Sequence, residues 1–71
     1  MKIKQGIKLA KQQGFMWVVV DANDGIFGCR NEPFIAIYDE KYNLYDWTRK
    51  DEWLGCYGGS KWWTSTKRKV S

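Results

Sequence analysis

Histidine is absent from the 71-residue sequence, which also has one proline and two cysteines. Histidine is the commonest general base near neutral pH and the commonest metal ligand, so its absence removes the usual centre of acid–base or metal chemistry. Cys29 and Cys56 are too far apart to form the spaced ligand pairs of a structural zinc site. The glycines at 55, 58 and 59 match neither the P-loop nor the dinucleotide-binding spacing. The sequence therefore predicts no metal and no cofactor.

Long apolar runs are missing as well. No segment approaches the roughly 20 apolar residues that a membrane span needs, and the lysine-rich start lacks the apolar segment and cleavage site of a signal peptide. We therefore interpret Met1 as the true start and expect a cytoplasmic protein without a membrane partner. A reducing cytosol favours two buried thiols on nearby strands at Cys29 and Cys56, with a disulfide as the alternative.

The acidic residues do not form a recognisable catalytic or calcium site. Asp21 and Asp24 belong to the segment DANDG, which lacks the longer ligand series of an EF-hand and favours a hairpin turn. The adjacent acids at 39–40 and 51–52 would suit a carboxylate pair for hydrolysis, but such residues in polar turns are usually solvated. We expect no enzyme activity, which leaves recognition of another molecule as the function.

The N-terminal segment predicts an amphipathic helix over residues 1–14. Ile3, Ile7 and Ala10 recur at helical spacing, and Gly14 follows at the position of a C-terminal cap. A local alternation of apolar and charged residues leaves a strand as the alternative. Because a chain of this size builds only a small core, most of its five Trp, four Tyr and three Phe should be needed inside it.

The next segment, FMWVVVD, predicts a central strand, because both of its faces are apolar and should be covered. Phe15, Trp17 and Val19 would share one face, and Met16, Val18 and Val20 the other, with the helix packed on one of them. A hairpin turn containing Asn23, Asp24 and Gly25 then leads to a second strand over residues 26–30.

The segment after Pro33, FIAIYDEKYNLYDW, fits two structures. Its aromatic residues recur at helical spacing, but FIAIY also reads as a strand, so we favour two strands joined by a turn through residues 39–43 and ending at Trp47. EWLGCY predicts a further strand, with Trp53, Gly55 and Tyr57 on one face and Leu54 and Cys56 on the other.

These elements predict an α+β fold, in which a small antiparallel sheet of three to five strands carries the N-terminal helix. The single domain would comprise the helix (1–14), a β-rich core (15–66) and a basic tail (67–71). We expect the last two residues, Val70 and Ser71, to be solvated, because chain termini are commonly disordered.

The charges are segregated along the chain. The first 20 residues hold four lysines and no acid, residues 57–71 hold four basic residues and no acid, and all eight acids lie between. If the two ends meet in space, one basic face results, which would attract phosphates or an acidic protein surface.

The segment SKWWTSTKRK, residues 60–69, adds two tryptophans to the basic end. As a strand it would send the two indoles to opposite faces, one into the core and one toward a partner. Exposed aromatics beside basic residues suit single-stranded nucleic acid, and the same residue types concentrate binding energy at protein interfaces. The residues expected to contact a partner are Trp62, Trp63, Lys61, Lys67, Arg68, Lys69, Lys4, Lys8 and Lys11.

The order of landmarks, WVVVDANDGIFGCRNEP followed by a spaced tryptophan, WLGCYGG and a final WW, resembles small accessory proteins encoded by phages and prophages. The resemblance covers roughly residues 17–63 and rests on Asp21, Asp24, Gly25, Pro33, Trp47, Trp53, Gly55 and Trp63. It implies stoichiometric binding to a host or phage protein machine, as a modulator or inhibitor. A nucleic-acid-binding module is the alternative function.

Overall fold

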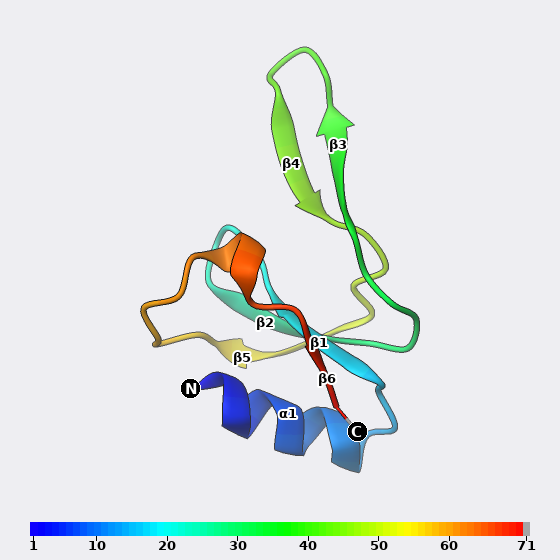
Figure 1. Cartoon of the computed structure of the whole chain (residues 1–71), viewed down its shortest axis with the longest axis vertical. Helices are drawn as coiled ribbons and strands as arrows, with labels where there is room; N and C mark the ends of the chain where they lie inside the picture. The colour runs from blue at the N-terminus through cyan, green and yellow to red at the C-terminus, as the bar shows by residue number, and fades with distance from the viewer. Residues whose placement is uncertain (71) are drawn as a thin grey trace.

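The computed structural model of the chain describes residues 1–70 and consists of a four-stranded antiparallel sheet, one helix packed on it, and a separate β-hairpin (Figure 1). The elements are α1 (Ile3–Gln12), β1 (Trp17–Val20), β2 (Gly25–Cys29), β3 (Ile35–Asp39), β4 (Leu44–Trp47), β5 (Glu52–Cys56), a 3₁₀ helix η1 (Trp63–Ser65) and β6 (Arg68–Lys69). The sheet has the strand order β5-β2-β1-β6. The predicted α+β fold class is confirmed.

Helix α1 forms and ends as the sequence predicts. Gly14 has φ +82° and donates from its N–H to the carbonyl of Lys11, while the N–H of Phe15 donates to that of Ala10, which is the Schellman pattern that ends many helices. Gly6 and Ala10 are buried against the sheet. A Cβ at Gly6 would lie 2.8 Å from Cγ2 of Ile26, so this glycine permits the close approach of helix and sheet. None of the helices in residues 1–70 is long and apolar enough to cross a membrane.

Strand β1 is central, and its two faces are covered by different parts of the chain. On the helix side, Val18, Val20 and Ile26 pack with Ala10, Phe15 and Tyr57. Phe15 was expected on the opposite face, with Trp17 and Val19. That prediction was wrong because the strand begins only at Trp17, so strand alternation does not reach Phe15.

The opposite face of β1 is covered by two tryptophans that come from outside the sheet. Val19 and Cys29 are buried here with Trp47 of β4, and Trp63 of η1 packs against them. The rings of Trp47 and Trp63 meet edge to face, with centroids 6.3 Å apart and an interplanar angle of 83°. The indole Nε1 of Trp47 donates to the carbonyl of Val20 at 2.9 Å, so this ring both fills the core and satisfies its polar atom.

Strand β5 departs from the predicted alternation. Its register with β2 shifts between Ile26 and Phe27, and Leu54 then joins the helix-side core together with Tyr57, while Trp53 is exposed. The prediction that Trp53 and Tyr57 share one face was therefore wrong. The physical reason is the irregularity in the ladder, which changes the face of the residues that follow.

Cys29 lies on β2 and Cys56 on the adjacent strand β5, at opposite ends of the region where these two strands pair. Both thiols are free, as predicted, since Cys56 pairs with Gly25 at one end of β2 and Cys29 lies at the other end. Cys29 is buried, whereas Cys56 is exposed, so the expectation that both are buried was wrong for Cys56.

The basic C-terminal segment is part of the sheet. Arg68 and Lys69 form β6, which pairs with Val18 and Trp17 of β1. The N–H of Val70 donates to the carbonyl of Met16 at 2.8 Å, and its side chain packs on the core, so the expected solvated end was wrong for Val70. Ser71 lies outside the described residues.

Candidate interaction surfaces

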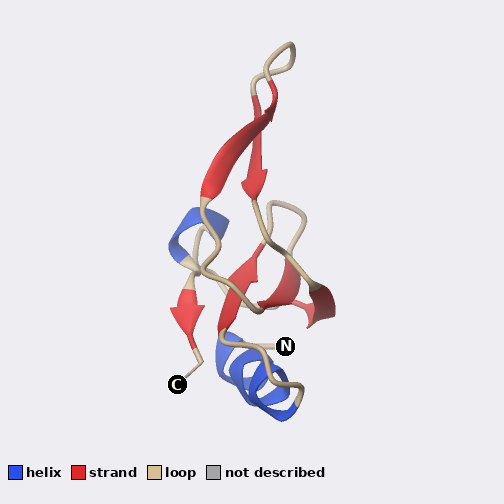
Figure 2. Ribbon diagram, turned by 90° about the vertical axis from the view of Figure 1, so that its right-hand side faces the viewer, coloured by secondary structure: helices blue, strands red, loops and turns tan. Residues whose placement is uncertain are grey.

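The β3–β4 hairpin projects from the body of the molecule and forms no ladder with the main sheet (Figures 1 and 2). Residues Ile35, Ala36 and Ile37 pair with Trp47, Asp46 and Tyr45, respectively, and an irregularity follows between Ile37 and Asp39. The preference for two strands over a helix in this segment is thus confirmed. Asn43 adopts φ 53° in the turn, a conformation that asparagine tolerates better than most residues.

Large apolar side chains are exposed along the whole hairpin. Tyr38 and Tyr42 are each 64% exposed, and the others are between about one third and one half exposed. We call this set the hairpin surface: Phe34, Ile35, Ile37, Tyr38, Tyr42, Leu44 and Tyr45. Neighbouring residues of a strand point to opposite faces, so the hairpin surface occupies both faces of the ribbon.

The sequence predicts Tyr42 in the turn and the other six residues in strands, but none of them was expected to form a binding site. A signal was present, because residues 34–38 are apolar on both strand faces, while α1 is the only α-helix within residues 1–70 that could cover a sheet. The helix covers the main sheet, which leaves the hairpin uncovered. An exposed apolar surface of this extent on a small protein is typical of an interaction site.

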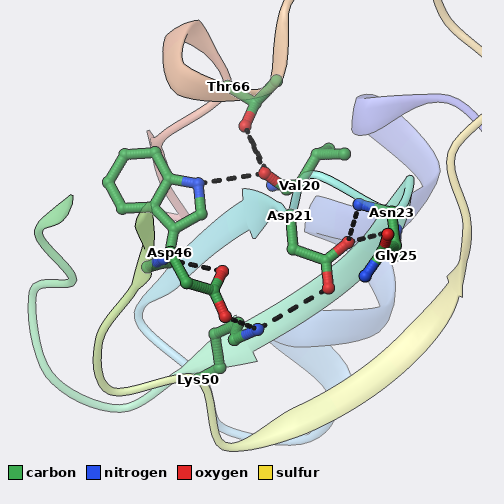
Figure 3. A network of polar contacts seen from close by, with 8 residues as sticks. Val20, Asp21, Asn23, Gly25, Asp46, Lys50 and Thr66 are labelled. Atoms are coloured by element: carbon green, nitrogen blue, oxygen red, sulfur yellow. Dashed lines mark hydrogen bonds and ion pairs between the residues drawn. The ribbon is translucent and has the colours of Figure 1, made fainter. Parts of the chain in front are cut away.

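A lysine fixes the base of the hairpin to the main sheet (Figure 3). The Nζ of Lys50 lies 2.7 Å from Oδ2 of Asp46, at the end of β4, and 3.6 Å from Oδ2 of Asp21, which follows β1. The same ammonium group lies 4.6 Å from the ring centroid of Phe27. Lys50 is only 19% exposed, so these contacts are partly shielded from water.

The carboxylate of Asp21 also organises the β1–β2 turn. Its Oδ1 accepts hydrogen bonds from the backbone N–H groups of Asn23 and Gly25, at 3.0 and 2.8 Å. Within this turn, Asp24 is the residue that adopts a positive φ, of 61°. The DANDG segment is therefore a hairpin turn, as predicted, and its aspartate links that turn to Lys50.

The two adjacent tryptophans have different environments. Trp62 is 71% exposed, whereas Trp63 packs against the core. The prediction that only one of the two indoles is exposed is confirmed. The predicted cause, alternation of side chains along a strand, is wrong. The residues lie at the start of the 3₁₀ helix η1 rather than on a strand, so it is the turn that separates them.

Two basic residues of the end segment are engaged within the chain. The Nζ of Lys67 lies 3.2 Å from Oε2 of Glu32 and 5.3 Å from the ring centroid of Trp17. Nη1 of Arg68 donates to the carbonyls of Ser65 and Lys67, both at 2.9 Å. Lys69 is exposed. Residues 60–69 therefore do not form one continuous contact surface. Lys67 and Arg68 stabilise local structure through contacts within the chain.

The two basic ends of the chain do meet, at a cavity of about 400 Å³. It is lined by Lys2, Ile3, Lys4, Tyr57, Gly59, Ser60 and Lys61, and we call it the lysine cavity. It brings Lys4 and Lys61, both predicted contact residues, together with Lys2, and no acidic side chain lines it. Lys8 and Lys11 are exposed on α1 and do not line it.

The titratable groups offer little reactive chemistry. Within residues 1–70, no three His, Cys, Asp or Glu side chains gather in a way that would hold a metal ion. Burial raises the pKa of the Cys29 thiol to about 11, with the nearby Asp51 carboxylate adding to the effect, so this thiol is protonated and a poor nucleophile at neutral pH.

No protein-family model matches this chain, and no curated protein or solved structure is significantly similar to it.

Proposed function

We propose that this chain is a small, non-enzymatic cytoplasmic protein that acts by stoichiometric binding to another protein, with the hairpin surface as its main contact. The supporting observation is a projecting ribbon whose two faces carry exposed apolar side chains. A half-exposed large side chain presents roughly 100 Å², so this set presents on the order of 700 Å². That value is close to the roughly 800 Å² per partner of a standard protein interface.

The biological setting follows from the sequence resemblance. Small accessory proteins of phages and prophages often act by binding host or phage machines, so the resemblance supports a modulator or inhibitor of that kind. Its base at Lys50 and Trp47 holds the hairpin in a defined direction, which lowers the entropic cost of presenting it to a partner.

The proposal is tested by affinity capture from nuclease-treated lysate of the host cell, which the resemblance implies is bacterial. The wild-type protein should retain a specific protein in a defined ratio, and Tyr38→Ser combined with Tyr42→Ser should reduce the capture at least tenfold. Met16→Ser removes a 44% exposed apolar side chain outside the hairpin and should leave the capture unchanged. Equal capture by all three proteins would exclude the hairpin as the contact.

Nucleic-acid binding is the second candidate function, and the lysine cavity favours it. Three lysines without an ion pair among residues 1–70 surround this cavity, and the exposed indole of Trp62 follows Lys61 directly. Lysines that contact phosphates beside an aromatic ring that stacks on bases are the usual elements of a single-strand binding site.

A further inference from the structure

Tyr57 forms one wall of the lysine cavity and brings a buried hydroxyl group to it. The residue is only 9% exposed. Its hydroxyl oxygen accepts the N–H of Lys61 at 3.2 Å, but the hydroxyl hydrogen has no acceptor within residues 1–70. A Cβ at Gly59 would overlap this hydroxyl, so the glycine lets the loop lie directly against it. Buried polar groups normally have partners, and Tyr57 therefore retains a donor for a ligand in the cavity.

The beginning of helix α1 forms the facing wall of the lysine cavity (Figure 1). The N–H groups of Ile3 and Lys4 lie in the first turn, where a helix has no carbonyl of its own to accept them. They have no acceptor within residues 1–70. The first turn also contains no acidic residue, so no carboxylate there balances the positive end of the helix dipole. Two backbone donors are thus added to the hydroxyl of Tyr57.

The charge of the cavity favours a phosphate monoester over other anions. Lys2, Lys4 and Lys61 line it, none of them takes part in an ion pair within residues 1–70, and no acidic side chain lines it. A phosphate monoester carries a charge of about −1.5 to −2 at pH 7 and has three acceptor oxygens. A carboxylate has two oxygens and a single charge, and each internal phosphate of a strand also carries a single charge. Three cations and three unused donors therefore match the monoester best.

The size of the cavity indicates that the phosphate is attached to a larger group. The cavity has a volume of about 400 Å³, whereas a water molecule occupies about 30 Å³ in the liquid. A phosphate ion has the size of a few water molecules and would leave most of this space unfilled. Ile3, Tyr57 and the methylene stems of the lysines make the remaining wall mostly apolar. Such a wall suits a flat ring attached to the phosphate.

We propose that the lysine cavity binds the terminal phosphate of a nucleotide, with the attached base against Ile3 and Tyr57. A free nucleoside monophosphate and the phosphorylated end of a single strand both present this group. The choice of a nucleotide rests on the second candidate function, because the exposed indole of Trp62 follows Lys61 directly and would stack on the next base of a strand. No residue of the hairpin surface lines the cavity, so the inference is independent of the proposed binding to a protein.

The first experiment measures fluorescence anisotropy with purified protein and labelled single strands of about ten nucleotides. A strand with a terminal phosphate should bind at least tenfold more tightly than the same strand with hydroxyl groups at both ends. A hydroxyl-ended strand that is one nucleotide longer carries its additional charge as a diester and should not regain this affinity. Equal binding of the phosphorylated and hydroxyl-ended strands would overturn this inference but leave the second candidate function intact. Absence of binding to every strand would count against both.

Competition against the phosphorylated strand distinguishes the two sources of the nucleotide. Displacement by adenosine monophosphate at concentrations similar to those of the unlabelled strand would identify the free nucleotide as the ligand. Displacement that needs at least tenfold more adenosine monophosphate would identify the strand end. Adenosine and inorganic phosphate should displace the strand far less well, since each lacks one half of the group. If phosphotyrosine competed as well as adenosine monophosphate, or adenosine monophosphate did not compete at all, the assignment to a nucleotide would be wrong.

Two lysines on the same helix provide matched variants. Lys4→Gln removes a charge from the cavity and should reduce the preference for the terminal phosphate at least fivefold. Lys8→Gln removes the same charge one turn along α1, outside the cavity, and should retain the preference. Tyr57→Phe keeps the ring but lacks the hydroxyl and should also reduce the preference, with circular dichroism confirming that each variant is folded. An identical preference in the two lysine variants would overturn the proposal.

Discussion

At the scale of single residues, Thr66 connects the end of the chain to the central strand. Its hydroxyl accepts the N–H of Val20 at 2.8 Å and donates to the carbonyl of Trp63 at 2.6 Å (Figure 3 shows its place beside Val20). Strand β6 pairs only with Trp17 and Val18, so Thr66 satisfies a β1 backbone group beyond the end of that strand. The side chain of Thr66 thus takes the place of a backbone hydrogen-bond acceptor from a neighbouring strand.

We expect Thr66→Val to lower the free energy of unfolding by about 1–3 kcal/mol, because the buried N–H of Val20 loses its acceptor. Urea denaturation measures this change. Thr66→Ser keeps the hydroxyl and should cost less. If Val and Ser were equally destabilising, the hydrogen bond would not be the cause.

The raised pKa of the Cys29 thiol predicts that the free energy of unfolding depends on pH. Its folded-state pKa is raised from 9.0 to about 11, chiefly by burial. The stabilisation from the protonated thiol is therefore complete below about pH 9 and is lost as the pH rises toward 11. We expect the free energy of unfolding to fall across this window, and to fall less in Cys29→Ala. Urea denaturation at a series of pH values checks this, and identical slopes for the two proteins would contradict it.

At the scale of elements, the hairpin depends on its base for its direction. Lys50 connects β4 to the turn after β1, and the indole of Trp47 occupies the core beside β1. These contacts join two parts of the molecule that share no backbone ladder.

We expect Lys50→Met to lower stability by about 1–3 kcal/mol, because Asp21 and Asp46 would keep partly buried charges without their shared cation. Hydrogen exchange should also become faster in the hairpin than in β1 and β2. Lys41→Met, which removes an exposed lysine at the hairpin tip, is the matched control and should change stability by less than about 0.5 kcal/mol. Uniform acceleration throughout the chain would show that Lys50 stabilises the whole fold rather than the hairpin base.

The elements themselves were largely predictable. Local chemistry defines α1 through its apolar spacing and glycine cap, and β1 and β2 through β-branched residues and the Asp-Gly turn. The faces of Phe15 and Tyr57 were not predictable, because they depend on where a strand begins and on a shift in the β2–β5 register. Both are set by neighbouring strands rather than by the residues' own sequence context.

At the scale of the whole molecule, folding gathers basic residues from the two ends of the chain. Lys2, which precedes α1, and Lys4 of α1 meet Lys61 at the lysine cavity, whereas Lys67 and Arg68 are engaged in local contacts. Any affinity for nucleic acid should therefore concentrate at this cavity.

We expect single-stranded DNA binding that weakens with salt, and a greater loss on replacing Lys2, Lys4 and Lys61 together by glutamine than on replacing Lys8, Lys11 and Lys69. Each triple variant removes three positive charges, so the comparison separates position from net charge. Fluorescence anisotropy across a salt series measures both. Equal losses would indicate attraction by net charge alone.

The sequence by itself predicted the fold class, the helix with its cap and the central strand, and it favoured two strands over a helix in the segment that ends at Trp47. These follow from residue spacing and turn chemistry, which act over a few neighbouring residues. Tertiary structure alone decided that Trp62 is exposed while Trp63 is packed, that Lys4 meets Lys61, and that the β3–β4 hairpin stands uncovered. These features depend on which faces the single helix and the returning end of the chain cover, and that choice is made by packing across the whole molecule.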